Sequence, residues 1–194
     1  MKLNLPTQIT LIRIFLIPVM LLFAMPAPFW IPDGAAQFLS TRGFTVAFII
    51  FFIASVTDLL DGYLARKMNI VTNMGVFLDP IADKLLVVSA LIAILSRGYR
   101  YGWIVVAIIA REFIVSGLRL IAAGKGTIVS ADRFGKAKTV LQMVAISAVF
   151  LNNYPLSLVS SIDFGRYLMG LAALLTLYSG ANYIRVNRRL LREG

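Results

Sequence analysis

The sequence predicts an all-α integral membrane protein with six transmembrane helices, and two observations support this fold class. Of the 194 residues, 59% are hydrophobic and only 14% are charged, whereas a soluble domain is about half apolar and a quarter charged. The apolar residues also gather into six segments, each near the length of roughly 20 residues that a helix needs to cross a bilayer. No repeat or linker separates the segments, so we expect a single membrane domain over residues 1–194.

The six apolar segments lie at about 7–25, 43–66, 76–96, 101–123, 134–151 and 164–186. The first contains Pro18, which can kink a helix. It follows a short stretch, "NLPT", that we expect at the membrane interface, with Thr7 or Thr10 near the helix cap. The last segment is rich in small residues, which let membrane helices pack closely.

The first segment has an alternative interpretation as a cleaved signal peptide, because a basic start precedes an apolar run. Pro26 and Pro28 would crowd the cleavage site, and five more apolar segments follow. We therefore expect the first segment to remain as a helix.

The placement of basic residues predicts the orientation. With six spans, fourteen Lys and Arg residues fall on the side of both termini, and four fall on the other side (Arg42, Arg97, Arg100 and Arg166). Arg111 lies within the fourth segment and belongs to neither side. Cytoplasmic loops carry the excess of basic residues, so we expect a multi-pass protein of the inner (cytoplasmic) membrane with both termini in the cytoplasm. Orientation and anionic membrane lipids then account for the net charge of +10, and no nucleic-acid partner is expected.

The chain contains no Cys and no His. This excludes disulfides, thiolate nucleophiles and zinc–thiolate sites, and it removes the commonest general base. Any metal site must use oxygen ligands, which favour Mg²⁺, Mn²⁺ or Ca²⁺.

Four aspartates lie close together in the stretch 58–84, "DLLDGYLARKMNIVTNMGVFLDPIADK". Asp58 and Asp61 end the second segment, and Asp79 and Asp83 begin the third, so each pair shares one helix face. The short turn makes these helices antiparallel, and the four carboxylates can converge. Such a cluster repels itself in low dielectric unless cations compensate it, which predicts a site for Mg²⁺ or Mn²⁺. Ordinary helix caps are the alternative, but Asp58 and Asp61 lie at the wrong helix end for capping.

Small residues accompany the aspartates. Gly62 and Ala65 follow the first pair, and Gly75 precedes the second. Glycine inside a helix costs up to about 1 kcal/mol relative to alanine. Its use beside carboxylates indicates space for a ligand.

The spacing D-x-x-D-G-x-x-A-R-x8-G-x-x-x-D-x-x-x-D resembles the signature of the CDP-alcohol phosphotransferases. The resemblance implies six helices, a homodimer, and a polar cavity that opens to membrane lipids and faces the cytoplasm. All eight fixed positions are filled, by Asp58, Asp61, Gly62, Ala65, Arg66, Gly75, Asp79 and Asp83.

Three further blocks resemble those family members that use glycerol phosphate: "NLPTQITLIR" (4–13), "REFIVSGLRLIAA" (111–123) and "GKAKTVLQMVA" (135–145). Thr7 is a small departure, since the family pattern has Asn there. The resemblance implies transfer of the phosphatidyl group from CDP-diacylglycerol to sn-glycerol 3-phosphate, giving phosphatidylglycerol phosphate and CMP. Another acceptor, such as inositol phosphate or serine, is the nearer alternative. A divalent-cation transporter is the remote one, because carboxylates also line ion paths.

The expected roles follow from this reaction. Two metal ions held by Asp58, Asp61 and Asp79, with Asp83 shared, would clamp the donor's diphosphate and stabilise the leaving CMP. Since the chain has no His, we expect Asp83 to be the general base, and the resemblance also places the base at the fourth aspartate. The residues expected to bind CDP-diacylglycerol are Asp58, Gly62, Ala65, Arg66 and Gly75.

A phosphorylated acceptor needs cations of its own. Arg111 lies inside the fourth apolar segment, and its neighbour Glu112 is not expected to pair with it, because adjacent residues point apart on a helix. We therefore expect a basic pocket for the acceptor phosphate, made of Arg111, Arg119, Lys136 and Lys138. The alternative is a set of orientation charges with a structural ion pair.

Overall fold

The computed structural model describes residues 5–68, 73–124, 133–160 and 162–187. Within these ranges, the side chains of 5–6, 58–68, 73–77, 123, 133–134 and 136 lie outside the description.

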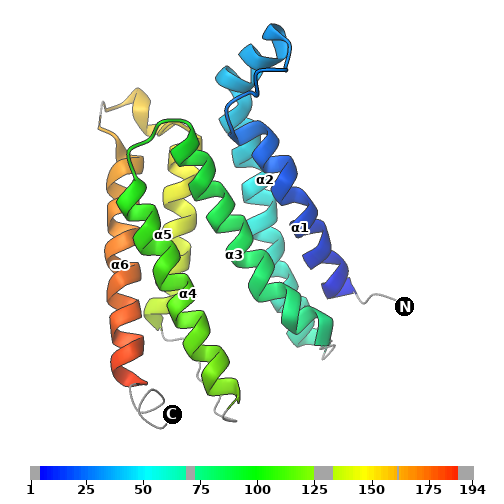
Figure 1. The fold of residues 1–194 in the computed structure, drawn as a ribbon, viewed down its shortest axis with the longest axis vertical. Coiled ribbons are helices and arrows are strands. Elements are labelled where there is room, and N and C mark those ends of the chain that lie inside the picture. The colour runs from blue at the N-terminus through cyan, green and yellow to red at the C-terminus, as the bar shows by residue number, and fades with distance from the viewer. Residues whose placement is uncertain (1–4, 69–72, 125–132, 161, 188–194) are drawn as a thin grey trace. The chain divides into compact units, whose positions relative to one another are not determined.

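The regular secondary structure of the described chain is helical, and no strand occurs in it (Figure 1). Each of the six apolar segments forms one helix, which confirms the all-α prediction. The helices are α1 (Leu5–Ala24), α2 (Asp33–Met68), α3 (Asn73–Ser96), α4 (Gly102–Gly124), α5 (Arg133–Phe150) and α6 (Phe164–Val186), with a short 3₁₀ helix, η1 (Leu156–Leu158), before the last.

Two helix starts differ from the prediction. α2 begins at Asp33, ten residues before the expected position 43, because an acidic residue in the first turn stabilises a helix N-terminus even where the sequence is polar. The first turns of α2 mix polar and apolar residues and extend past the end of α1 in Figure 1. α1 begins at Leu5, so Thr7 and Thr10 lie within the helix with buried side chains, and the expectation that they cap it was wrong.

Among the described helices, α1 over Thr7–Ala24 and α2 over Asp33–Thr57 are long and apolar enough to cross a membrane. Only 33% of the residues in each of these stretches is buried. Large apolar side chains such as Phe15, Leu22 and Phe52 remain exposed, as expected of a surface that faces lipid or a partner. That all six helices cross the membrane stays a prediction.

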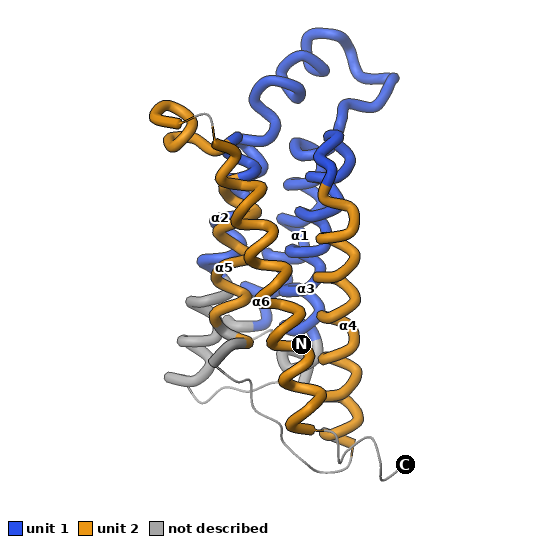
Figure 2. Tube along the Cα trace, turned by 90° about the vertical axis from the view of Figure 1, so that its left-hand side faces the viewer, with its two compact units in different colours: residues 1–100, 149–152 blue, residues 101–148, 153–194 orange. Residues whose placement is uncertain are grey.

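The chain forms two compact units (Figure 2). The first unit contains residues 1–100 and 149–152, and the second contains residues 101–148 and 153–194. In the first unit, α1 packs against both α2 and α3. Its buried face changes character along the helix, being polar in the first half and apolar in the second. The buried residues of this face are Thr7, Thr10, Arg13, Ile17, Met20 and Ala24.

Arg97 lies at the C-terminal end of α1, next to the apolar half of its buried face. It donates hydrogen bonds to the main-chain carbonyls of Phe23 (3.2 Å), Ala24 (2.8 Å) and Leu39 (2.7 Å). The last carbonyls of a helix lack partners within that helix, so the guanidinium caps α1 and joins it to α2. The guanidinium carbon of Arg97, Cζ, also lies 5.0 Å from the centre of the Phe44 ring. This distance is within the range of a cation–π contact.

In the second unit, α4 packs against α6. The buried face of α4 repeats every three or four residues and is apolar except at one position, Arg111. Its members are Val105, Ile108, Arg111, Val115, Leu118 and Ala122. The facing helix is lined mostly by small residues, which are Gly165, Ala172, Ala173, Thr176, Ser179 and Gly180. An arginine in such an apolar stripe needs partners of its own.

Candidate active site

The third helix carries Asp79 and Asp83 one turn apart. Asp79 is exposed and Asp83 is half-buried. The hydroxyl of Thr10, a fully buried residue of α1, donates a hydrogen bond to Oδ1 of Asp79 over 2.6 Å. The polar half of the buried face of α1 therefore holds one carboxylate of the aspartate motif.

The rest of the motif lies on the expected helices. Asp58, Asp61, Gly62, Ala65 and Arg66 belong to α2 and Gly75 belongs to α3, but their side chains lie outside the described residues. Of the four aspartates only Asp79 and Asp83 are described, and no group of three or more possible metal ligands occurs within the described part of the chain. Convergence of the four carboxylates stays a prediction.

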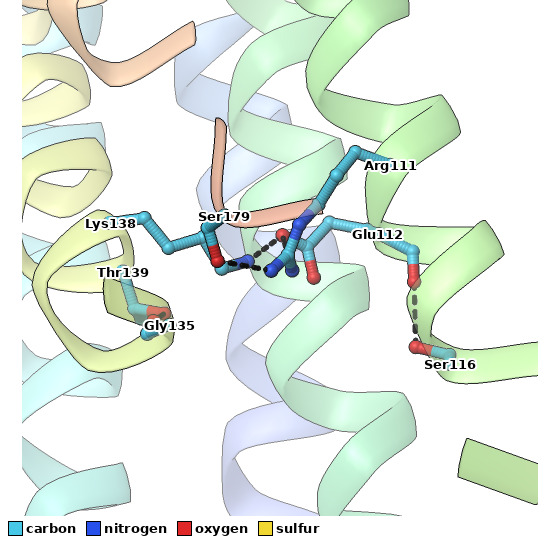
Figure 3. A network of polar contacts seen from close by, with 7 residues as sticks. All are labelled: Arg111, Glu112, Ser116, Gly135, Lys138, Thr139 and Ser179. Atoms are coloured by element: carbon cyan, nitrogen blue, oxygen red, sulfur yellow. Dashed lines mark hydrogen bonds and ion pairs between the residues drawn. The ribbon is translucent and has the colours of Figure 1, made fainter. Parts of the chain in front are cut away.

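The second unit contains a buried network of charges, drawn in Figure 3. Nη1 of Arg111 lies 3.4 Å from Oε1 of Glu112. Nζ of Lys138, on α5, donates a hydrogen bond to the same oxygen. Nη2 of Arg111 donates a second hydrogen bond to Oγ of Ser179, on α6, over 2.7 Å. Arg111 and Lys138 are only 7% and 6% exposed, so both cations lie inside the unit.

The expectation that Glu112 would not pair with Arg111 was wrong. Adjacent side chains diverge at their β-carbons on a helix, but both of these side chains are long and their charged ends meet. Lys138 also draws the Glu112 carboxylate toward α5. The predicted proximity of Arg111 and Lys138 is observed, with a carboxylate between them.

The other two residues of the predicted basic pocket do not join this network in the described contacts. Arg119 lies two turns further along α4, about 12 Å by the helical rise, and is exposed. Its guanidinium lies 5.6 Å from the centre of the Tyr183 ring. The side chain of Lys136 is outside the described residues.

Two residues of α6 that position Arg111 were not singled out from the sequence. Ser179 accepts its hydrogen bond, and Gly180 leaves room for its aliphatic stem. A β-carbon at Gly180 would lie 2.7 Å from Cγ of Arg111, which is too close for ordinary packing. The small residues of this segment indicate close packing, but they do not show which side chain they face.

The described contacts of the network join two cations to one carboxylate. Buried charges of this kind are costly unless they are paired. Arginine and lysine are the usual partners of phosphate oxygens.

Residues 3–178 match the family model described as CDP-alcohol phosphatidyltransferase. This match covers the whole aspartate motif and the charged residues Arg111, Glu112 and Lys138.

The chain belongs to the CDP-alcohol phosphatidyltransferase family.

Similar proteins within this family match over nearly their full lengths. The chain is 46% identical over 193 residues to the CDP-diacylglycerol–glycerol-3-phosphate 3-phosphatidyltransferase of Bacillus subtilis, with 97% of each chain covered. Proteins of the same name from Rickettsia felis and Haemophilus influenzae are each 37% identical to it. These alignments cover 96% of this chain in both cases, and 96% and 94% of the respective relatives.

The contact between Arg111 and Gly180 makes a testable prediction for this phosphatidyltransferase. Gly180→Ala should lower the midpoint temperature of unfolding in detergent, because overpacking of this kind costs about 1–3 kcal/mol. Gly170→Ala is the matched control on the same helix, where an added β-carbon meets nothing within 4 Å. The control should leave the midpoint unchanged or raise it, since alanine is the better helix former. Equal midpoints for the two variants would contradict the packing role of Gly180.

Proposed function

We propose that this CDP-alcohol phosphatidyltransferase transfers the phosphatidyl group from CDP-diacylglycerol to sn-glycerol 3-phosphate, releasing phosphatidylglycerol phosphate and CMP. The observation that carries the proposal is the nearly full-length similarity, at 37–46% identity, to three proteins that bear the name of this reaction. The buried cations of the second unit agree with an acceptor that carries a phosphate.

The proposed setting is the inner membrane of a bacterium. All six helices cross the bilayer, both termini and the active site face the cytoplasm, and the enzyme is a homodimer. The fourteen basic residues on the side of the termini support this orientation. A cytoplasmic active site also gives access to a water-soluble acceptor, while the donor reaches it from the membrane.

The proposed donor site belongs to α2 and α3. Asp58, Asp61, Asp79 and Asp83 would hold two Mg²⁺ or Mn²⁺ ions, and this all-oxygen ligand set suits those ions. The hydrogen bond from Thr10 fits this role, because it orients one carboxylate oxygen of Asp79. When bound, the metal ions neutralise the diphosphate and the leaving phosphate.

The remaining donor contacts come from α2 and α3 as well. Arg66 pairs with a diphosphate oxygen, and Gly62, Ala65 and Gly75 leave space for the cytidine. These roles rest on the match between the fixed positions of the motif and this sequence.

The chemical step exchanges one phosphorus–oxygen bond for another. The acceptor hydroxyl oxygen attacks the phosphorus that carries the diacylglycerol, and the bond from that phosphorus to the CMP oxygen breaks. The hydroxyl proton passes to the Asp83 carboxylate, and CMP departs with the negative charge of the broken bond. Asp83 suits this role because it is half-buried, lies one turn from Asp79 and belongs to a chain without His.

The acceptor phosphate is proposed to bind Arg111 and Lys138 of the second unit, and Lys136 and Arg119 are proposed to contribute further positive charge. Hydrogen bonds from charged donors contribute about 1.5–3 kcal/mol each. An acceptor without a phosphate cannot accept these hydrogen bonds. We therefore expect glycerol phosphate to bind more tightly than serine or free glycerol.

The reaction is tested with the purified protein in detergent, labelled CDP-diacylglycerol and a panel of acceptors. We expect CMP and phosphatidylglycerol phosphate with sn-glycerol 3-phosphate, and little product with serine, inositol phosphate or glycerol. Excess EDTA should stop turnover, and added Mg²⁺ or Mn²⁺ should restore it. Preferred use of another acceptor would contradict the proposed reaction, and full turnover in EDTA would contradict the metal site.

The role of Asp83 predicts a specific loss in Asp83→Asn. Turnover should fall by about 10²-fold or more, as is usual when a general base is removed. The affinity for CDP-diacylglycerol should stay close to that of the wild type, and metal binding should be largely intact because the other three aspartates still hold the ions. Asp61→Asn is the comparison variant, and it should weaken metal and donor binding together. Near-normal turnover by Asp83→Asn at saturating acceptor would reject Asp83 as the base.

A further inference from the structure

Two buried cations from different helices share a single carboxylate oxygen in the second unit. Lys138 of α5 and Arg111 of α4 both contact Oε1 of Glu112, which is itself only 18% exposed. Each cation is more than nine-tenths buried. The carboxylate therefore joins two of the four residues proposed to bind the acceptor phosphate.

A negative group in a phosphate site looks unfavourable at first, since it repels the ligand. The cations, however, need it before the ligand arrives. Two positive charges that both lie within reach of one oxygen atom repel each other strongly in low dielectric. Burying a charge without a counter-ion is also costly. Glu112 offsets both costs and holds the two cations close together.

The carboxylate still leaves capacity for a phosphate. A guanidinium has five N–H donors and an ammonium has three, so each cation can serve Glu112 and a phosphate oxygen at the same time. The other side of Arg111 is fixed by Ser179, and its stem lies against Gly180. Arg111 is thus held in place from α6 as well as by Glu112 of its own helix.

We infer that Glu112 is a positioning residue for the acceptor: its carboxylate holds Arg111 and Lys138 together as the cationic pair that receives the phosphate of glycerol 3-phosphate. This inference rests on the proposed function, because it assigns the anion to the acceptor. Glu112 acts through the two cations and needs no contact with the substrate.

The test is steady-state kinetics of Glu112→Gln, which keeps the shape of the side chain and removes its charge. We expect the KM for glycerol 3-phosphate to rise about tenfold or more, the change that corresponds to one charge-assisted hydrogen bond. The KM for CDP-diacylglycerol should change by less than about twofold. Glu112→Asp keeps the charge and should recover part of the loss. Asp33→Asn removes the charge of an exposed aspartate at the start of α2 and should leave both constants unchanged.

A double-mutant cycle with Lys138→Gln separates positioning from a general structural role. If Glu112 acts through Lys138, adding Glu112→Gln to Lys138→Gln should raise the KM for glycerol 3-phosphate by only about threefold or less. The full tenfold increase in both backgrounds would overturn the inference. So would a rise in both Michaelis constants together with a lower unfolding temperature, which would identify a purely structural residue.

The outcomes also separate this inference from the proposed function. If the wild type does not use glycerol 3-phosphate, both fall. If it does, and Lys138→Gln raises the acceptor KM while Glu112→Gln leaves it unchanged, the proposed function stands and the inference about Glu112 is overturned.

Discussion

The organisation of the second unit depends on one ion-paired carboxylate, that of Glu112. In a chain that is 59% hydrophobic and 14% charged, a buried cation without a partner would destabilise the helices that carry it. Glu112 compensates one cation on its own helix and one on α5, and Ser179 brings α6 to the same guanidinium. These contacts join α4, α5 and α6, and they also hold two positive charges close together.

Buried polar groups of the first unit also need partners, and they find them in a different way. The buried face of α1 is polar only in its first half, where Thr10 holds the Asp79 carboxylate. Its second half is apolar, and at that end Arg97 satisfies main-chain carbonyls that α1 cannot satisfy itself. Polar groups are thus confined to the part of α1 that faces the aspartate motif, and the apolar remainder stabilises the packing of the three helices.

Much of the fold could be predicted from the sequence, because bilayer thickness and hydropathy determine where apolar helices lie. The start of α2 at Asp33 could not be predicted, because its first turns mix polar and apolar residues and the continuous apolar run begins only after Gly43. The fixed spacing of the aspartate motif indicated the family, and burial of Arg111 in an apolar stripe indicated a special role. The partnerships of Glu112 and Thr10 were missed, because they depend on which side chains meet between helices far apart in the sequence, and spacing along the chain does not contain that information.

The central claim is that buried cations of the second unit bind the phosphate of the acceptor. It is tested most directly by measuring both Michaelis constants of Arg111→Gln, with exposed Arg166→Gln as the matched control. We expect the KM for glycerol 3-phosphate to rise about tenfold or more, as for the loss of a charge-assisted hydrogen bond, with the KM for CDP-diacylglycerol nearly unchanged and the control like the wild type. A rise confined to the KM for CDP-diacylglycerol would contradict the account, because it would assign Arg111 to the donor.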